Sequence, residues 1–220
     1  MNVLFSDFSS DMLHVVGDVH GDLVSYADAL KEADAQKSIQ LGDFSILKSD
    51  LSRREALLKE RGLNPENHLF FGGNHDFYGE SCEPYEEHAL GHFGPVFEDA
   101  FFIRGAESVD KDRRIFGTTW FKEEELNFKQ ASNAIYLYEK LRPRVVFSHD
   151  APQNVVNELF SPVWQSSTRD LLQRLFEIHQ PELWFFGHFH DSLSCEFQGT
   201  QFRLLDILEV SSFDFSKANP

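Results

Sequence analysis

The chain has 220 residues, and its 41% hydrophobic content is enough to build an extensive core. Its 20 Lys and Arg against 36 Asp and Glu give a formal net charge of −16, which disfavours an extended surface for duplex nucleic acid. Cys82 and Cys195 form no CxxC pair, the start MNVLFSDFSSD lacks the features of a signal peptide, and no stretch is long enough to cross a bilayer, so we expect a cytoplasmic protein without a membrane partner.

Short apolar runs that end in Asp, Asn or His, in all but one case after a Gly, recur along the chain. Each run is typical of a buried strand followed by a polar turn. In chain order they are LHVVGDVHGD, SIQLGDF, HLFFGGNHD, RVVFSHDAP and LWFFGHFHD. Further strands are predicted in AFFIRGAE and RRIFGTTWF, before the fourth run, and in LSCEF and TQFRLLDI near the C-terminus.

Amphipathic helices are predicted between these strands. Apolar residues recur with helical spacing from Leu23 to Leu30, from Ala131 to Leu141 and from Leu171 to Phe176. Ser167 and Asp170 resemble a capping box at the start of the last of these helices. The alternation of strands and helices predicts an α/β fold whose sheet is largely buried.

A single domain over residues 1–220 is expected, with an excursion at about residues 78–120. The excursion follows from the long gap between the third and fourth polar turns, in which CEPYEEHALGHFGPV is typical of a loop and a short helix. A long helix is predicted from about Lys122. The run Glu123, Glu124 and Glu125 would then lie at its start, where negative charge complements the helix dipole.

Polar residues gather at the predicted carboxyl ends of the strands, where open α/β sheets bind their ligands. They are Asp18, His20, Asp43, Asn74, His75, His149, His188 and His190. Oxygen and nitrogen donors without a thiolate suit Mn, Fe, Zn or Co. In an extended segment His188 and His190 would point the same way, which favours a metal site, although a surface loop with hydrogen-bonded histidines has the same pattern.

The ordered blocks GDVHG, GD, GNHD, a lone His after an apolar strand, and GHFH resemble the calcineurin-like metallophosphoesterase superfamily. The stretch from Ile103 through GTTW to the acidic run, followed by SHDAP, resembles the small bacterial and phage members of that superfamily. The resemblance extends from Asp18 to His190. It implies a four-layer αββα sandwich and a hydrolase with two divalent metal ions, of which Mn is the first expectation and Fe, Zn, Co or Ni are alternatives.

The resemblance also implies roles for the polar residues. Asp18, His20 and His190 would bind the first metal ion, Asn74, His149 and His188 would bind the second, and Asp43 would join the two. A metal-bridging hydroxide would then attack the phosphoester.

His75 matches the outer histidine of the family, which is taken to donate a proton to the leaving group or to stabilise its charge. Asp76 would orient that imidazole. The alternative is a purely structural role for His75 beside the third strand.

Features outside the metal set bear on the substrate. The stretch GDFSILKS lacks the second Asp and the Arg of the GDxxDRG motif of protein phosphatases, which favours a phosphodiester or a small nucleotide over a phosphomonoester or phosphoprotein. Arg104, Arg114 and Trp120 are candidates to line a substrate pocket, although arginines that pair with surface carboxylates have the same pattern. A non-catalytic binding or scaffold protein with this fold is a further alternative, and the sequence does not predict an oligomeric state.

Overall fold

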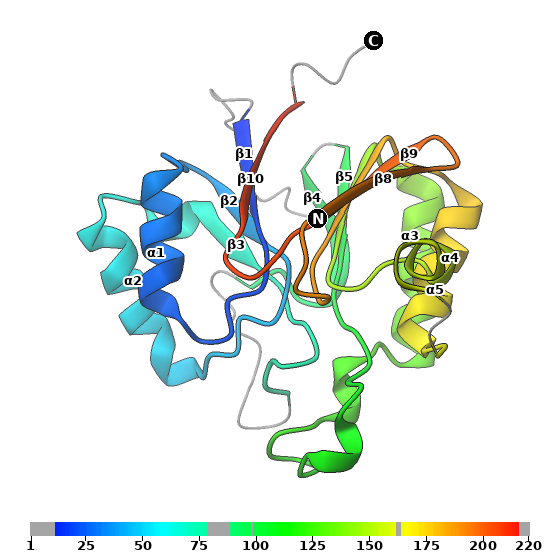
Figure 1. The fold of residues 1–220 in the computed structure, drawn as a ribbon, viewed down its shortest axis with the longest axis horizontal. Helices are drawn as coiled ribbons and strands as arrows, with labels where there is room; N and C mark the ends of the chain where they lie inside the picture. Colours follow the sequence, from blue (N-terminus) through cyan, green and yellow to red (C-terminus); the bar gives the residue numbers. More distant parts are fainter. Residues whose placement is uncertain (1–11, 79–88, 98, 162–163, 216–220) are drawn as a thin grey trace.

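The computed structural model describes residues 12–78, 89–97, 99–161 and 164–215. Two mixed β-sheets pack face to face, and helices cover the outer face of each sheet (Figure 1). The layers therefore follow the order α, β, β, α, which confirms the four-layer α/β sandwich predicted from the sequence.

The first sheet has the strand order β10-β1-β2-β3. Its three parallel strands are β1 (Met12–Val16), β2 (Ser38–Gln40) and β3 (His68–Phe70), and β10 (Val210–Asp214) pairs antiparallel with β1. Helices α1 (Leu23–Glu32) and α2 (Leu51–Glu60) pack against this sheet, and two short 3₁₀ turns, η1 (Lys48–Asp50) and η2 (Pro65–Asn67), flank α2. This half contains two successive crossovers, in which α1 connects β1 to β2 and α2 connects β2 to β3.

The second sheet has the strand order β4-β5-β6-β7-β9-β8. Its strands are β4 (Phe93–Phe97), β5 (Ala100–Ile103), β6 (Val145–Ser148), β7 (Leu183–Phe186), β8 (Leu193–Phe197) and β9 (Thr200–Leu204). Helices α3 (Phe128–Leu141), α4 (Gln153–Phe160) and α5 (Ser167–Ile178) cover its outer face (Figure 1). Two more 3₁₀ turns, η4 (Lys111–Arg113) and η5 (Lys122–Glu124), lie between β5 and α3.

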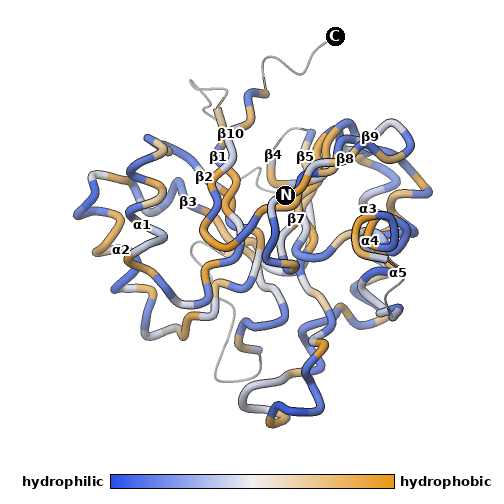
Figure 2. The backbone as a smooth tube through the Cα atoms, in the orientation of Figure 1, coloured by the Kyte–Doolittle hydropathy of each residue, from blue (hydrophilic) through white to orange (hydrophobic). Residues whose placement is uncertain are grey.

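Alternation along the strands divides the apolar side chains among the layers. In β1, Val15 packs between the two sheets, whereas its neighbour Val16 packs under the helices of the first sheet. In β5, Phe102 faces the layer between the sheets and Phe101 faces α3. Because adjacent strand residues point to opposite faces, strands such as β5 and β7, which are largely buried on both sides, contain only apolar residues. Hydrophobic segments are accordingly common among the strands of the two sheets (Figure 2).

Several elements differ from the sequence-based expectations. Strands β4 and β10 were not predicted, because β4 contains Gly94 and Pro95 and β10 is only partly buried. Residues 113–121, predicted as a strand, instead form a tight turn in which the backbone N–H groups of Thr118, Thr119 and Trp120 all point at the carbonyl oxygen of Ile115. Since β4 and β5 belong to the second sheet, the segment that leaves the sheets is residues 104–127, here called the β5–α3 segment (Figure 1).

Two helix starts also differ from the prediction. Helix α3 begins at Phe128 rather than near Lys122, because Asn127 and Gln130 form a complete capping box. The cap of α5 is Ser166, whose side chain accepts a hydrogen bond from the Arg169 backbone N–H, and not Ser167.

In the described part of the chain, no helix is long and apolar enough to span a bilayer. Cys195 carries a free thiol. Cys82 and residues 83–88 of the predicted loop and short helix lie outside the described residues, as do the first residues of the chain.

A buried ion pair joins β6 to α5 behind the strand ends. Arg169 is 2% exposed and Asp150 is fully buried, and Arg169 Nε donates to Asp150 Oδ2 over 2.8 Å. The guanidinium also packs over the rings of Trp164 and Phe189. Asp150 is thus the buried counter-charge of Arg169.

We expect Arg169→Ala to lower the free energy of unfolding by about 3–5 kcal/mol, because it leaves the Asp150 carboxylate buried without its partner. Urea unfolding followed by circular dichroism measures the change. Arg174→Ala is the matched control, since Arg174 lies on the exposed face of α5. Similar losses in the two variants would contradict a structural role for the buried pair.

Candidate metal centre

The polar residues predicted as metal ligands lie together where the two sheets meet. The first sheet supplies Asp18 after β1, Asp43 after β2 and Asn74 after β3, whereas the second sheet supplies the histidines after β6 and β7. Two groups of side chains place their ligand atoms within 4.8 Å of one another: Asp18, His20, Asp43 and His190, and Asp43, His149 and His188. Asp43 belongs to both groups.

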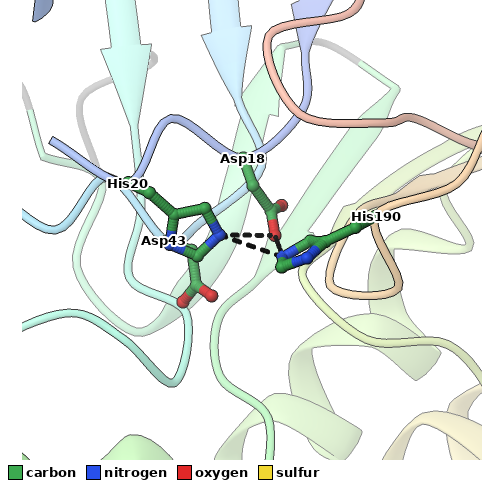
Figure 3. A group of neighbouring side chains, drawn as sticks. All are labelled: Asp18, His20, Asp43 and His190. Atoms are coloured by element: carbon green, nitrogen blue, oxygen red, sulfur yellow. Dashed lines mark hydrogen bonds and ion pairs between the residues drawn. The ribbon is translucent and has the colours of Figure 1, made fainter. Parts of the chain in front are cut away.

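The first group surrounds the Asp18 carboxylate. Its Oδ2 atom lies 3.1 Å from His190 Nε2 and 3.7 Å from His20 Nε2. The two Nε2 atoms are 2.9 Å apart and the imidazole planes are nearly perpendicular, so both rings turn a nitrogen toward the same point (Figure 3). A carboxylate oxygen and two imidazole nitrogens converge there.

The second group surrounds His149, which is fully buried. Its Nε2 atom lies 3.3 Å from Asp43 Oδ1 and 3.0 Å from Asn74 Oδ1. Its Nδ1 atom lies 2.9 Å from the carbonyl oxygen of Leu41, which can only accept a hydrogen bond, so Nδ1 carries a proton. Nε2 is therefore the ring atom that faces the two oxygen donors.

Left-handed backbone conformations aim several of these side chains. The φ angles are 48° at His20, 54° at Asp43, 73° at His188 and 51° at His190. Because non-glycine residues rarely adopt positive φ, four of them at one place mark locally strained turns. The segment of His188 and His190 is consequently not extended, and the two rings diverge: His190 joins the first group and His188 the second.

Glycines at the strand ends leave room for the cluster. A Cβ atom on Gly73 would lie 2.4 Å from Asp43 Oδ1, and one on Gly187 would lie 2.4 Å from Asp18 Oδ1. At Gly42, where φ is +104°, a Cβ atom would lie 2.6 Å from His149 Nδ1. The glycines of these three turns thus have a specific cause, which is the close approach of a side chain from another strand end.

The electrostatics of the cluster favour a bound positive charge. Burial alone would raise the pKa of Asp18, but His149 and the hydrogen bonds from His190 and His20 hold it below its usual range. Burial also opposes ionisation of Asp43, yet His149 lowers the Asp43 pKa. Two buried carboxylates therefore remain ionised side by side.

The histidines respond to the same burial and charge. Burial would lower the pKa of His149, but Asp43 and Asp18 raise it to about 10. A proton on Nε2 of His149 would then occupy the space between Asp43 and Asn74, where a cation would lie. Burial lowers the pKa of His188 to about 4, which leaves its ring neutral and able to coordinate.

These residues fit a divalent metal centre. Within the described residues, the buried Oδ2 atom of Asp43 has no hydrogen-bond partner, although a buried carboxylate oxygen is costly without one. Neutral imidazoles, ionised carboxylates and an amide oxygen are ligands for Mn, Fe, Zn or Co. A cation beside Asp43 would supply the missing partner of this oxygen atom.

His75 lies at the edge of this cluster, with its ring centroid 5.2 Å from that of His20. Its backbone N–H donates to Asp43 Oδ1 over 2.6 Å. Burial, with help from Arg114 and His20, lowers the pKa of His75, although Asp43 opposes them.

Asp76 differs from its predicted role as the residue that orients His75. Its buried carboxylate accepts hydrogen bonds from the backbone N–H groups of Gly73 and Ser45, over 2.7 and 2.6 Å, and from that of Phe44. Burial and, to a smaller extent, the charge of Asp43 raise the pKa of Asp76 to about 6. Asp76 therefore ties the turns after β2 and β3 together, and in the described structure no hydrogen bond joins it to the His75 ring.

The three residues predicted to line a substrate pocket have different environments. Arg104 is 4% exposed, and it donates to His92 and to the backbone carbonyl of Glu123 and packs over Tyr78, so burial contradicts its predicted role. The Trp120 indole N–H donates to Glu124. Arg114 alone among the three contacts the cluster, through His75 and the backbone of Asn74.

Ser108 and Glu124 were missed by sequence reasoning. Asn74 Nδ2 donates to Ser108 Oγ over 3.3 Å, and Ser108 Oγ donates to Glu124 Oε2 over 2.7 Å. This chain turns the Asn74 amide so that its oxygen faces His149. Glu124 is 2% exposed and lies in η5 rather than at the predicted helix start, and burial raises its pKa. No motif in the sequence links these two residues to Asn74.

Known proteins resemble this chain in sequence pattern and in fold. The family model described as calcineurin-like phosphoesterase matches residues 13–192. A dimetal phosphatase from Danio rerio has a TM-score of 0.55 at 15% identity, over 90% of this chain and 87% of that one. The phosphopantetheinyl hydrolase PptH from Mycobacterium tuberculosis has a TM-score of 0.54 at 13% identity, over 95% and 93% of the two chains.

The protein TT1561 of Thermus thermophilus has a TM-score of 0.53 at 12% identity, over 93% of this chain and 98% of that one. No curated protein matches the sequence significantly. Identities this low show a shared fold, whereas the family model covers most of the chain, including every residue of the cluster. The chain therefore belongs to the calcineurin-like phosphoesterase family, and it is a hydrolase that acts on phosphoester bonds.

Proposed function

We propose that the protein hydrolyses a phosphodiester or a small nucleotide at a centre of two divalent metal ions, with manganese as the first candidate. Asp18, His20 and His190 would hold one ion and Asn74, His149 and His188 the other. The observation that carries the proposal is the position of Asp43, whose carboxylate belongs to both groups of ligand atoms. The similarity to a dimetal phosphatase supports the same number of ions.

The metal ions, when bound, would lower the pKa of a water molecule and offset the negative charge that develops on the phosphoryl oxygens. The chain itself prepares the ligands. Leu41 fixes the proton on Nδ1 of His149, and Ser108 turns the oxygen of Asn74 toward the same ring. His75, at the edge of the cluster, would donate a hydrogen bond to the leaving oxygen and stabilise its charge.

A diester fits the charges around the cluster better than a monoester does. A phosphomonoester dianion carries one more negative charge than a diester, and enzymes often meet that charge with an arginine. Arg104 is buried with donors engaged, and the Arg114 side chain is only 9% exposed. Of the arginines predicted to bind substrate, neither offers a free guanidinium to a second phosphoryl charge.

Metal analysis tests the dinuclear proposal directly. Protein reconstituted with manganese and then desalted should carry about two ions per chain by elemental analysis. Asp43→Asn should lower this to one ion or fewer, because the shared ligand loses its charge. Asp170→Asn, on the exposed start of α5, is the control and should keep both ions. One ion in the wild type would contradict a dinuclear centre, and none would favour a scaffold protein.

Substrate preference is tested with bis(4-nitrophenyl) phosphate and 4-nitrophenyl phosphate in the presence of manganese. We expect a kcat/KM for the diester at least about 10-fold above that for the monoester, because neither predicted arginine is free to meet the extra charge. The same assay with iron, zinc and cobalt identifies the most active metal. A large preference for the monoester would reverse the substrate assignment, and no turnover with any of these metals would contradict the function.

His75→Ala tests the leaving-group role. Loss of a donor to a developing oxyanion costs roughly 10²–10³ in rate, so we expect a decrease of this order with a diester that releases a poor, alkyl leaving group. A diester that releases 4-nitrophenol should lose far less, because that phenolate is stable without help. Equal losses on the two substrates would instead indicate that His75 supports the metal ligands.

A further inference from the structure

Arg114 connects the β5–α3 segment to the edge of the cluster. Its Nη2 atom lies 2.8 Å from Nδ1 and 2.5 Å from Nε2 of His75. Its Nε atom lies 2.7 Å from Asp110 Oδ1. Its Nη1 atom donates to the backbone carbonyl of Thr119 over 3.3 Å and faces that of Asn74 at 3.5 Å. One guanidinium thus spans the outer segment and the turn after β3.

The enclosure of Arg114 argues against direct contact with substrate. Its side chain is 9% exposed, whereas its partner Asp110 is 43% exposed. Each of its three nitrogens already faces an acceptor. An arginine with these partners presents little surface to a phosphoryl group. Because its guanidinium is planar and rigid, it holds the groups that it contacts in fixed positions.

His75 depends on Arg114 for the position of its ring. The backbone of His75 is fixed on both sides, by its N–H to Asp43 and by the Ser45 hydroxyl that donates to its carbonyl oxygen. The ring itself rests against His20 on one side and Arg114 on another. Since Asp76 binds backbone N–H groups, Arg114 is, among the residues that the structure describes, the one whose polar atoms meet the imidazole nitrogens from outside the cluster.

An arginine can only donate, so the ring nitrogen that accepts from Arg114 must carry a lone pair. The lone pairs of the two ring nitrogens diverge, and Nη2 can therefore bond to only one of them. The remaining nitrogen then carries the N–H group of the ring. Arg114 in this way selects both the orientation and the tautomer of His75.

We propose that Arg114 is a positioning residue that holds the His75 imidazole so that its N–H group meets the leaving oxygen of the substrate; this rests on the proposed phosphoesterase mechanism. As the oxygen of the attacking hydroxide forms its bond to phosphorus, the bond between phosphorus and the leaving oxygen breaks, and its electron pair goes to that leaving oxygen. The His75 N–H group stabilises the resulting charge, and solvent water supplies the proton that completes the alcohol. Arg114 keeps its proton and does not touch the substrate.

Leaving-group dependence separates this role from a purely structural one. Help to the leaving oxygen matters most for an alkyl group and least for 4-nitrophenol, whereas damage to the metal ligands slows both substrates alike. With manganese bound, we expect Arg114→Ala to lower kcat/KM roughly 10-fold or more for a diester with an alkyl leaving group and less than about 3-fold for bis(4-nitrophenyl) phosphate. Metal content should remain that of the wild type.

Two further variants refine the comparison. Arg114→Lys keeps the charge but lacks the fork that reaches Asp110 and His75 together, so it should lose nearly as much as Arg114→Ala on the alkyl substrate. Arg113→Ala is the matched control, because Arg113 is exposed and adjacent in sequence. It should leave both rates and the metal content unchanged.

A double-mutant cycle completes the test. If Arg114 acts through His75, then His75→Ala combined with Arg114→Ala is no slower than His75→Ala alone. Additive losses, equal losses on the two substrates, full activity of Arg114→Lys, or loss of metal from Arg114→Ala would each overturn the proposal. These outcomes require an active wild type, so they are distinct from failure of the proposed function, in which the wild type has no turnover with any metal.

Discussion

The structure depends on two carboxylates, Asp18 and Asp43, that are buried side by side where the sheets meet. Both are 1% exposed, and like charges at such depth destabilise one another unless cations or donors surround them. Backbone N–H groups stabilise part of this negative charge. The N–H of His188 donates to Asp18, and that of His75 donates to Asp43. The imidazoles and, in the proposed holoenzyme, the divalent ions balance the rest of the charge.

The turns that carry these residues hold one another in strained conformations. The backbone N–H groups of Val19 and His20 both donate to the carbonyl oxygen of Asp43, so hydrogen bonds hold the turn after β1 against the turn after β2. Asp76 binds the second turn to the third through three backbone N–H groups. A left-handed non-glycine residue costs roughly 1–3 kcal/mol, which these interlocked turns and the packed sheets beneath them must offset. As a result, side chains from five strand ends point into one site.

The sequence predicted what depends on local pattern and missed what depends on tertiary contact. Apolar runs ending in polar turns located the parallel strands, and the ligand residues at their ends do lie together, because carboxyl ends of parallel strands share an edge. The left-handed turns at His188 and His190 could not be read from an alternating pattern. Glu124 was predicted to lie at a helix start, and only the fold brings it to Ser108 and Asn74. Both Arg104 and Arg114 were predicted to bind substrate, and nothing in the sequence distinguished their roles. The structure shows that their burial and their partners differ.

Anomalous diffraction from crystals of the manganese-loaded protein tests the central claim most directly. The account predicts two manganese peaks, one on each side of the Asp43 carboxylate, with Asp18, His20 and His190 around one and Asn74, His149 and His188 around the other. A single peak, or peaks that Asp43 does not touch, would contradict it.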